Sequence, residues 1–148
     1  MNRNLERPFH CAVKVTTEPA LIVRSTWLEG IKCFFSVGPF DCSTAKKDAQ
    51  TAAQEAEYHY PATIHNGVGD AYRHCLWNAL MTLHIGADQA KTVADNHEDL
   101  GEGPAHEKQM DLKNNLIGRE IGTKATSEAA ARIKCADGLY NGQLEVNP

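Results

Sequence analysis

Two segments of the chain carry polar side chains at helical spacing that could perform acid–base chemistry. The first places a carboxylate, a guanidinium, an imidazole and an indole on one side of a helix: Asp70, Arg73, His74 and Trp77. The second combines polar and very small residues on one side: Asp111, Asn114, Asn115, Gly118 and Gly122. Two helices that face each other across a polar site are a common way for a helical bundle to build a catalytic centre.

His74 is the candidate general base of this site. Asp70 precedes it by one helical turn, so its carboxylate can hold the imidazole in one tautomer and raise its basicity. Asp111 can complete a dyad from the facing helix, and Arg73 and Asn115 can stabilise negative charge that develops on an ester or phosphoester. These residues predict a small all-α hydrolase. The Asp70–His74 spacing also fits a solvated ion pair with little effect on stability.

Four residues are candidates for contacting the substrate. Trp77 and Asn114 lie on the two polar stripes, and Gly67 and Gly69 lead into the first helix, where the lack of side chains lets the backbone approach a ligand. Asn114 and Asn115 are poor helix formers, so some interaction must offset their presence in mid-helix. A buried polar layer that fixes helix register would also provide that interaction, without any catalysis.

A divalent metal is the one cofactor that the residue types allow. His97, Glu98 and His65 are the candidate ligands outside the proposed dyad, and together with Asp70, His74 and Asp111 they would leave an open position for water. Neither an H-E-x-x-H motif nor an EF-hand loop is present. His97 is expected to face the interior, where it is either a hydrogen-bonded core histidine or a functional one.

Helical periodicity dominates the chain from residue 42 onward. Propensity, capping residues and helix-breaking Gly or Pro predict five helices, over about 43–58, 70–85, 88–99, 106–123 and 127–137. In the fourth, Gly118 and Gly122 should let a neighbouring helix pack closely. Its other side is expected to be buried in the core through four apolar side chains: Leu112, Leu116, Ile117 and Ile121. The expected fold is mainly α, a small bundle of about five helices.

The first 41 residues have a different character. Two short runs rich in β-branched residues, 12–15 and 20–23, lie between prolines and suggest short strands or an extended arm. We therefore expect an irregular or hairpin-like N-terminal segment over 1–41 and a helical catalytic-type domain over 42–148.

Composition limits the class of protein further. With 148 residues the chain suits one globular domain, and a net charge of −4 with pI near 5.9 argues against a broad nucleic-acid surface. No apolar stretch is long enough for a transmembrane segment, and no signal-peptide layout is recognised at the amino end.

The five cysteines match no C-x-x-C spacing. A bridge between Cys42 and Cys135 would close a long loop if the protein works in an oxidising compartment. The alternative is that all five are small buried apolar side chains with free thiols.

Three ordered motifs resemble a family of bacterial helical domains of unknown function. They are GVGDAYRHCLWNALMT over Gly67–Thr82, NHE over Asn96–Glu98 and MDLKNNLIGREIG over Met110–Gly122. Members of that family often lie at the carboxyl end of secreted or polymorphic-toxin-type proteins. The resemblance implies bacterial origin, secretion or delivery into another cell, and a working role for eight residues: Asp70, Arg73, His74, His97, Glu98, Asp111, Asn114 and Asn115.

Three functions remain open from the sequence. The first is an exported or delivered hydrolase, in the manner of an antibacterial effector, with a small-molecule, lipid or cell-envelope substrate and a cognate immunity protein as candidate partner. The second is a non-enzymatic helical binding or immunity-like module whose polar layer fixes helix register. The third is a calcium-dependent phospholipase-like enzyme, although the chain lacks that family's His-Asp dipeptide and cysteine pattern.

Overall fold

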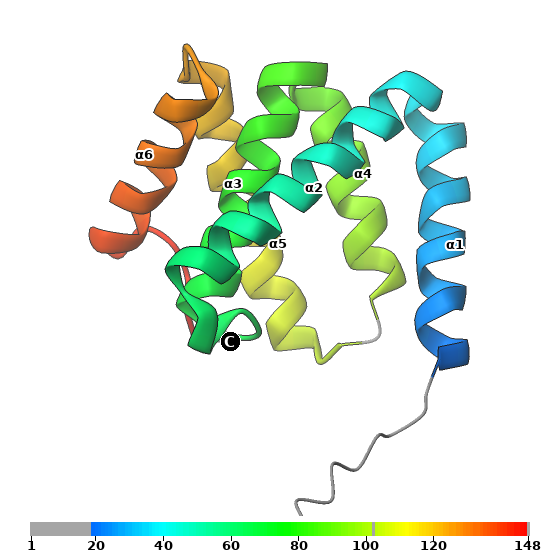
Figure 1. The fold of residues 1–148 in the computed structure, drawn as a ribbon, viewed down its shortest axis with the longest axis horizontal. Helices are drawn as coiled ribbons and strands as arrows, with labels where there is room; N and C mark the ends of the chain where they lie inside the picture. The colour runs from blue at the N-terminus through cyan, green and yellow to red at the C-terminus, as the bar shows by residue number, and fades with distance from the viewer. Residues whose placement is uncertain (1–18, 102, 148) are drawn as a thin grey trace, which may run out of the picture.

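The computed structural model describes residues 19–101 and 103–147, and within these ranges the chain forms a bundle of α-helices with no β-strand (Figure 1). The mainly α prediction is confirmed. The helices are α1 (Pro19–Val37), α2 (Pro39–His59), α3 (Val68–Ile85), α4 (Ala87–Leu100), α5 (Ala105–Lys124) and α6 (Glu128–Tyr140), with a short 3₁₀ turn over Pro61–Thr63. None of these helices is both long and apolar enough to cross a lipid bilayer.

Helix α3 is the central element of the bundle. It packs against α2, α4, α5 and α6 (Figure 1). Nearly every residue from Gly69 to Thr82 is buried. The helix ends where the sequence predicts, because Gly86 adopts a φ of 90° that few other residues tolerate. Since α3 is covered on several sides, any polar residue it carries must find a partner on a neighbouring helix.

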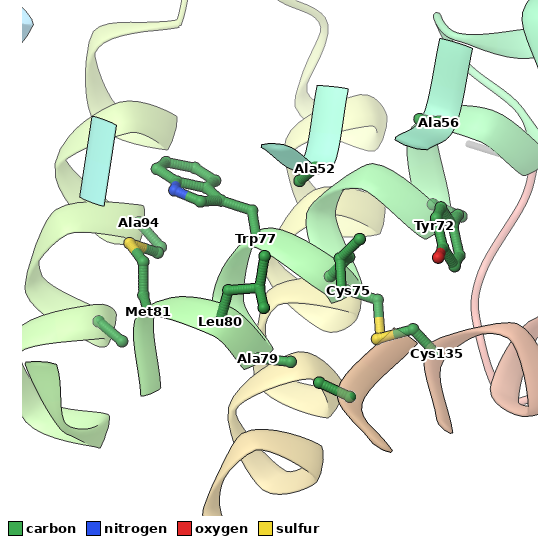
Figure 2. Packing of buried hydrophobic residues seen from close by; sticks show 14 of the residues in the cluster. Ala52, Ala56, Tyr72, Cys75, Trp77, Ala79, Leu80, Met81, Ala94 and Cys135 are labelled. Atoms are coloured by element: carbon green, nitrogen blue, oxygen red, sulfur yellow. A yellow bond between two sulfur atoms is a disulfide. The ribbon is translucent and has the colours of Figure 1, made fainter. Parts of the chain in front are cut away.

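Small residues allow the neighbouring helices to approach α3 closely. Ala52 and Ala56 of α2 are buried in the same core cluster as Trp77 and Tyr72 of α3, and Leu80 and Met81 fill the interior (Figure 2). Alanine side chains bring helix axes together while burying little polar surface, so the core relies on close packing rather than on bulky side chains.

Helix α5 turns its polar face inward, contrary to the expected burial of its apolar face. A Cβ atom on Gly118 would lie 2.3 Å from the Cys75 carbonyl oxygen, and one on Gly122 would lie 2.5 Å from that of Ala79. This confirms the close helix approach predicted for the glycines. The apolar side chains on the other side are only partly buried, and Leu116 is 50% exposed. The face of α5 that carries the glycines is buried, because only this face permits contact between the backbones of α3 and α5.

The amino-terminal part of the described chain also differs from expectation. Residues 20–23, a candidate strand, lie within α1, and residues 12–15 lie outside the described residues. A short apolar run fits a strand or a helix equally well, and here it continues into a longer helical segment. The expected boundary between residues 41 and 42 falls within α2.

Two disulfides connect the helices, and neither is the bridge considered from the sequence. Cys33 of α1 bonds to Cys42 of α2, and Cys75 of α3 bonds to Cys135 of α6 (Figure 2). The Cys42–Cys135 bridge and the alternative of five free thiols are both wrong. The bridge from α3 to α6 spans 60 residues of sequence and should stabilise the fold by about 3–5 kcal/mol by restricting the unfolded chain.

Candidate functional site

His74 lies at the interface between α3 and α5 with a fixed orientation. Its Nδ1 donates a hydrogen bond to Asn115 Oδ1 at 3.1 Å. The amide of Asn115 is itself oriented, because its nitrogen donates to Glu98 Oε1 at 3.0 Å and its oxygen also accepts from Asn78 Nδ2 at 2.7 Å. An oxygen facing Nδ1 requires the proton to be on Nδ1. The lone pair of the neutral imidazole is therefore on Nε2.

The Nε2 atom faces three charged groups. A terminal nitrogen of Arg73 lies 3.0 Å away, Asp111 Oδ1 lies 3.4 Å away and Asp70 Oδ1 lies 3.5 Å away. The sequence prediction placed these side chains around His74 from two helices, and the structure brings them together there. His74 itself is only 2% exposed, so these interactions take place largely out of bulk water.

Asp70 is held in its ionised form. Burial alone would raise the pKa of its carboxyl group, but the interaction with His74 and the charge of Arg73 lower the pKa well below its usual range. The backbone N–H of Asn66 also donates to Asp70 Oδ2 at 2.8 Å, and Arg73 Nε donates to Oδ1 at 3.1 Å. Asp70 thus provides a permanent negative charge beside the imidazole.

Asp111 has the opposite protonation behaviour. Burial and the charges of Glu98 and Asp70 raise the pKa of its carboxyl group, the charges of His74 and Arg73 oppose this shift, and the resulting pKa is about 6. Its Oδ1 atom is buried without a hydrogen-bond partner. A carboxyl group with a pKa near neutrality and an oxygen 3.4 Å from Nε2 is suited to exchanging a proton with the His74 imidazole.

Glu98, Asn78 and Arg119 complete the buried network around His74. Glu98 was expected as a metal ligand, and the structure instead places it behind Asn115, where burial raises the pKa of its carboxyl group. Asn78 and Arg119 were not among the predicted site residues. Arg119 donates to Asn78 Oδ1 at 2.9 Å, which fixes the amide that bonds to Asn115. The position of Asn78, one turn after His74, is the sequence signal that could have identified it.

A cavity of about 340 Å³ opens onto this cluster between α1, α2, α3 and α4. His74, Arg73 and Trp77 line it from α3. The Trp77 indole donates its N–H to the Ala45 carbonyl at 3.0 Å, and its ring meets the His97 ring edge to face at 5.3 Å. Trp77, which was predicted as a substrate contact, therefore lines the cavity, and its polar atom is already bonded.

His97 lies beside the cavity rather than inside the core. Its side chain is 39% exposed, and Nδ1 pairs with Glu29 Oε1 of α1 at 3.3 Å. Burial against Trp77 and the charges of His74 and Arg73 lower the pKa of His97, although Glu29 opposes this shift. The imidazole is therefore mostly neutral at neutral pH. Its partner is a carboxylate on α1, which the sequence could not indicate.

The remaining predicted residues lie away from the cavity. Asn114 bonds twice to the backbone of Glu145 near the carboxyl end, at 2.8 and 2.9 Å, so its amide is occupied by a structural contact. Gly69 packs against the Tyr60 and Thr63 carbonyls, where a Cβ would lie 2.9 Å from each oxygen, and Gly67 packs against the Thr63 side chain. His65 is exposed. Gly67, Gly69 and His65 thus lie near the 3₁₀ turn, and Asn114 contacts the segment near the carboxyl end. None of these four residues lines the cavity.

One group of side chains in the described part of the chain has metal-binding geometry. Asp70, His74 and Asp111 each offer one ligand atom, and these atoms lie within 4.8 Å of one another. However, a nitrogen of Arg73 lies 3.0 Å from Nε2, so a fixed cation already neutralises part of this negative charge. A metal would fit here only after the guanidinium moved. His97, Glu98 and His65 do not form such a group.

Fold and site together define an all-α protein with a buried histidine–carboxylate network beside a cavity. Residues 32–142 match the model of a family described as a domain of unknown function, DUF6973, and the chain belongs to this family. No solved structure matches the chain. The family has no assigned activity, so a function must be argued from the site itself.

Proposed function

We propose that this protein is a hydrolase of carboxylic or phosphoric esters in which His74 is the general base. One observation carries this proposal: the Nε2 atom of His74 is oriented by Asn115 and lies 3.4 Å from Asp111, beside Arg73, at the wall of a cavity. An oriented imidazole, a carboxylate and a cation next to a space for substrate are the components of general acid–base hydrolysis.

The reaction follows from these positions. Nε2 removes a proton from a water molecule as the water oxygen bonds to the carbonyl carbon or phosphorus of the ester. Arg73 stabilises the negative charge that develops on the ester oxygen, and Asp70 and Asp111 stabilise the imidazolium. The imidazolium then returns its proton to the departing alkoxide when the bond to the leaving oxygen breaks. The products are one acid and one alcohol, and the enzyme is regenerated.

The pH dependence of hydrolysis tests the role of Asp111. Its pKa of about 6 means that the carboxylate partner of the imidazolium is lost below this pH. We expect kcat/KM to rise with pH through a step near 6, and we expect Asp111→Asn to remove this step and to lower the plateau by roughly 10–100-fold. The measurement is kcat/KM for an activated ester between acid and neutral pH. A step that persists in Asp111→Asn would assign it to another group.

The same substitution should increase stability. The pKa of Asp111 is raised above its ordinary value of 3.8, so its ionisation opposes folding as the pH rises from 3.8 through 6, and this penalty is absent at lower pH. Asp111→Asn should therefore raise the free energy of unfolding at pH 8 by about 1–3 kcal/mol and have a smaller effect at pH 4. Urea unfolding at both pH values measures this. A loss of stability at pH 8 would contradict the protonation behaviour assigned here.

Chelation distinguishes a metal-free mechanism from a metal-dependent one. Because Arg73 already lies against Nε2, we expect EDTA to leave kcat/KM unchanged. Activity that is lost in EDTA and restored by Zn²⁺ or Mn²⁺ would make Asp70, His74 and Asp111 metal ligands. Restoration by Ca²⁺ alone would support the calcium-dependent, phospholipase-like alternative.

Two disulfides support export as the setting for this activity. Disulfides persist in oxidising compartments and are rare where thiols are kept reduced. We therefore propose that the protein acts outside the cytosol or after delivery into another cell, where a cognate immunity protein would be its natural partner. Mass spectrometry of the protein isolated from its host, with free thiols blocked before lysis, tests for the two bridges.

A further inference from the structure

The walls of the cavity are mostly apolar, although its reactive groups are charged. Helices α1 and α2 line it with the Cys33–Cys42 disulfide and with two alanines, and α3 and α4 add an indole and a valine: Ala45, Ala49, Trp77 and Val93. This apolar part of the surface offers no hydrogen bonds to a ligand and matches a hydrocarbon chain. The hydrogen-bonding groups of the cavity come from its polar lining residues: Glu29, Lys46, Arg73, His74, Asn96 and His97.

The two cavity residues that take part in the proposed reaction lie on one wall. Arg73 and His74 both come from α3, one turn before Trp77, whereas the walls from α1 and α2 are largely apolar. Lys46 and Glu29 also reach the cavity, but Lys46 is exposed and Glu29 is paired with His97, so both lie toward the rim. A ligand with a polar ester at one end and a hydrocarbon chain at the other would place each part against a matching wall.

Helix α1, which forms one wall of the cavity, also carries exposed apolar side chains. Gly30 and Cys33 of α1 line the cavity, and their neighbours Leu28, Ile31 and Phe34 are 48%, 36% and 50% exposed. Together these side chains give α1 an exposed apolar surface that a lipid bilayer can contact.

From this arrangement we infer that the cavity between α1, α2, α3 and α4 binds the acyl chain of a lipid ester whose carbonyl group lies against Arg73 and His74. This inference rests on the proposed hydrolase function and gives its substrate class. The bond that breaks is the one between the acyl carbon and the ester oxygen, so water yields a fatty acid and an alcohol. The acyl chain could belong to a bilayer lipid or to a soluble acyl ester, and the experiment separates the two.

A series of esters of increasing chain length provides the first test. Each methylene that enters the cavity should raise kcat/KM by about fourfold, the fold-change that corresponds to burying one methylene group. We expect kcat/KM for p-nitrophenyl esters to rise from acetyl to octanoyl and then to level off when the cavity is filled. A flat series from acetyl to decanoyl would overturn the acyl-chain assignment.

Filling the cavity from α2 provides a matched comparison. Ala49 lines the cavity, whereas Ala53 lies one turn further along the same helix and is exposed. Ala49→Phe should lower the octanoyl to acetyl ratio of kcat/KM by at least about tenfold, because it fills the space of several methylene groups. Ala53→Phe should leave the ratio unchanged. An equal effect of both substitutions, or no effect of Ala49→Phe, would count against chain binding in this cavity.

Binding without reaction keeps this inference separate from the hydrolase proposal. We expect N-methyl decanamide, which resists hydrolysis, to bind the unsubstituted protein and Ala53→Phe with similar Kd, and to bind Ala49→Phe at least about tenfold more weakly by calorimetry. If N-methyl decanamide binds but no ester is hydrolysed, the acyl-chain assignment of the cavity stands and the hydrolase proposal is refuted. Ester hydrolysis without binding of N-methyl decanamide and without dependence on acyl-chain length would support the hydrolase proposal and refute the acyl-chain assignment.

A final comparison identifies the kind of molecule that carries the acyl chain. Hydrolysis of phosphatidylglycerol vesicles at a rate above that of monomeric octanoyl ester would identify a bilayer lipid as the substrate. Phe34→Ser should then slow vesicle hydrolysis by about tenfold and leave the rate on the monomeric ester unchanged, because Phe34 is exposed and does not line the cavity. Faster hydrolysis of the monomeric ester would identify a soluble acyl ester, and hydrolysis of neither would overturn the lipid-ester assignment.

Discussion

Replacing His74 with alanine should lower kcat/KM for ester hydrolysis by roughly 10²–10⁴-fold, the usual contribution of a general base. The reason is that no neighbouring side chain can replace the imidazole as the base. The amide of Asn115 stays bonded to Asn78 and Glu98, and the nearby carboxylates act in the proposed reaction only by stabilising the imidazolium. His74→Gln, which can still donate to Asn115 but cannot act as the base, should lose as much activity.

The chain contains a matched control for this substitution. His84 lies on the same helix and bonds to both oxygens of Asp48 of α2 at 3.0 Å. It thus forms another histidine–carboxylate pair, but it does not line the cavity. We expect His84→Ala to alter the free energy of unfolding and to leave kcat/KM within about twofold of the value for the unsubstituted protein. Circular dichroism and thermal unfolding verify that all variants are folded.

The outcome also decides between the enzyme and a binding module. If His74 only helps to fix helix register, a folded His74→Gln protein would keep its full activity in every assay, and an apolar replacement would be neutral or stabilising. Loss of hydrolysis in a folded His74→Gln protein, with His84→Ala unaffected, is the result that an enzyme requires.

Replacing Gly118 with alanine should destabilise the fold by about 3 kcal/mol or more. The added Cβ would lie 2.3 Å from the Cys75 carbonyl oxygen and 2.9 Å from the Asn78 side chain, and the carbonyl belongs to the backbone of a buried helix. The two helices must therefore separate. Urea and thermal unfolding with intact disulfides measure the effect, which corresponds to a fall in Tm of roughly 10 °C in a domain of this size.

The same substitution should reduce activity, because Asp111 and Asn115 lie on α5 and reach His74 across this contact. Gly138→Ala is the control: it also introduces a Cβ into a helix, but the nearest atom would be 3.5 Å away. We expect Gly138→Ala to be neutral or stabilising by up to about 1 kcal/mol. Equal stability of the two variants would show that α3 and α5 do not meet at Gly118.

Much of the helical pattern could be predicted from local signals. Gly86 ends α3 through its positive φ, and Ser127 caps α6 by accepting a hydrogen bond from the Ala130 backbone at 3.1 Å. The predicted helices over 88–99 and 106–123 agree with α4 and α5 to within one residue at each end. Such signals act between residues a few positions apart, so they can be read from the sequence without knowledge of the neighbours.

The central part of the candidate site was also predictable, for the same reason. Asp70, Arg73 and His74 share a face because they are three or four residues apart in one helix, and Asp111 and Asn115 share a face of another. The glycine pair at 118 and 122 further indicated that these two faces meet. The helical spacing and the glycine pair were therefore sufficient to predict that the five candidate catalytic residues lie close together.

The amino-acid sequence by itself thus determined the helices, most of their ends and the side chains that meet around His74, since each depends on near neighbours in the chain. Only the tertiary structure decided which face of α5 is buried, which cysteines pair, and that α1 joins Trp77 and His97 around a cavity. These features depend on contacts between residues far apart in the chain. The choice among such contacts is made by the packing of all helices together, which no local pattern records.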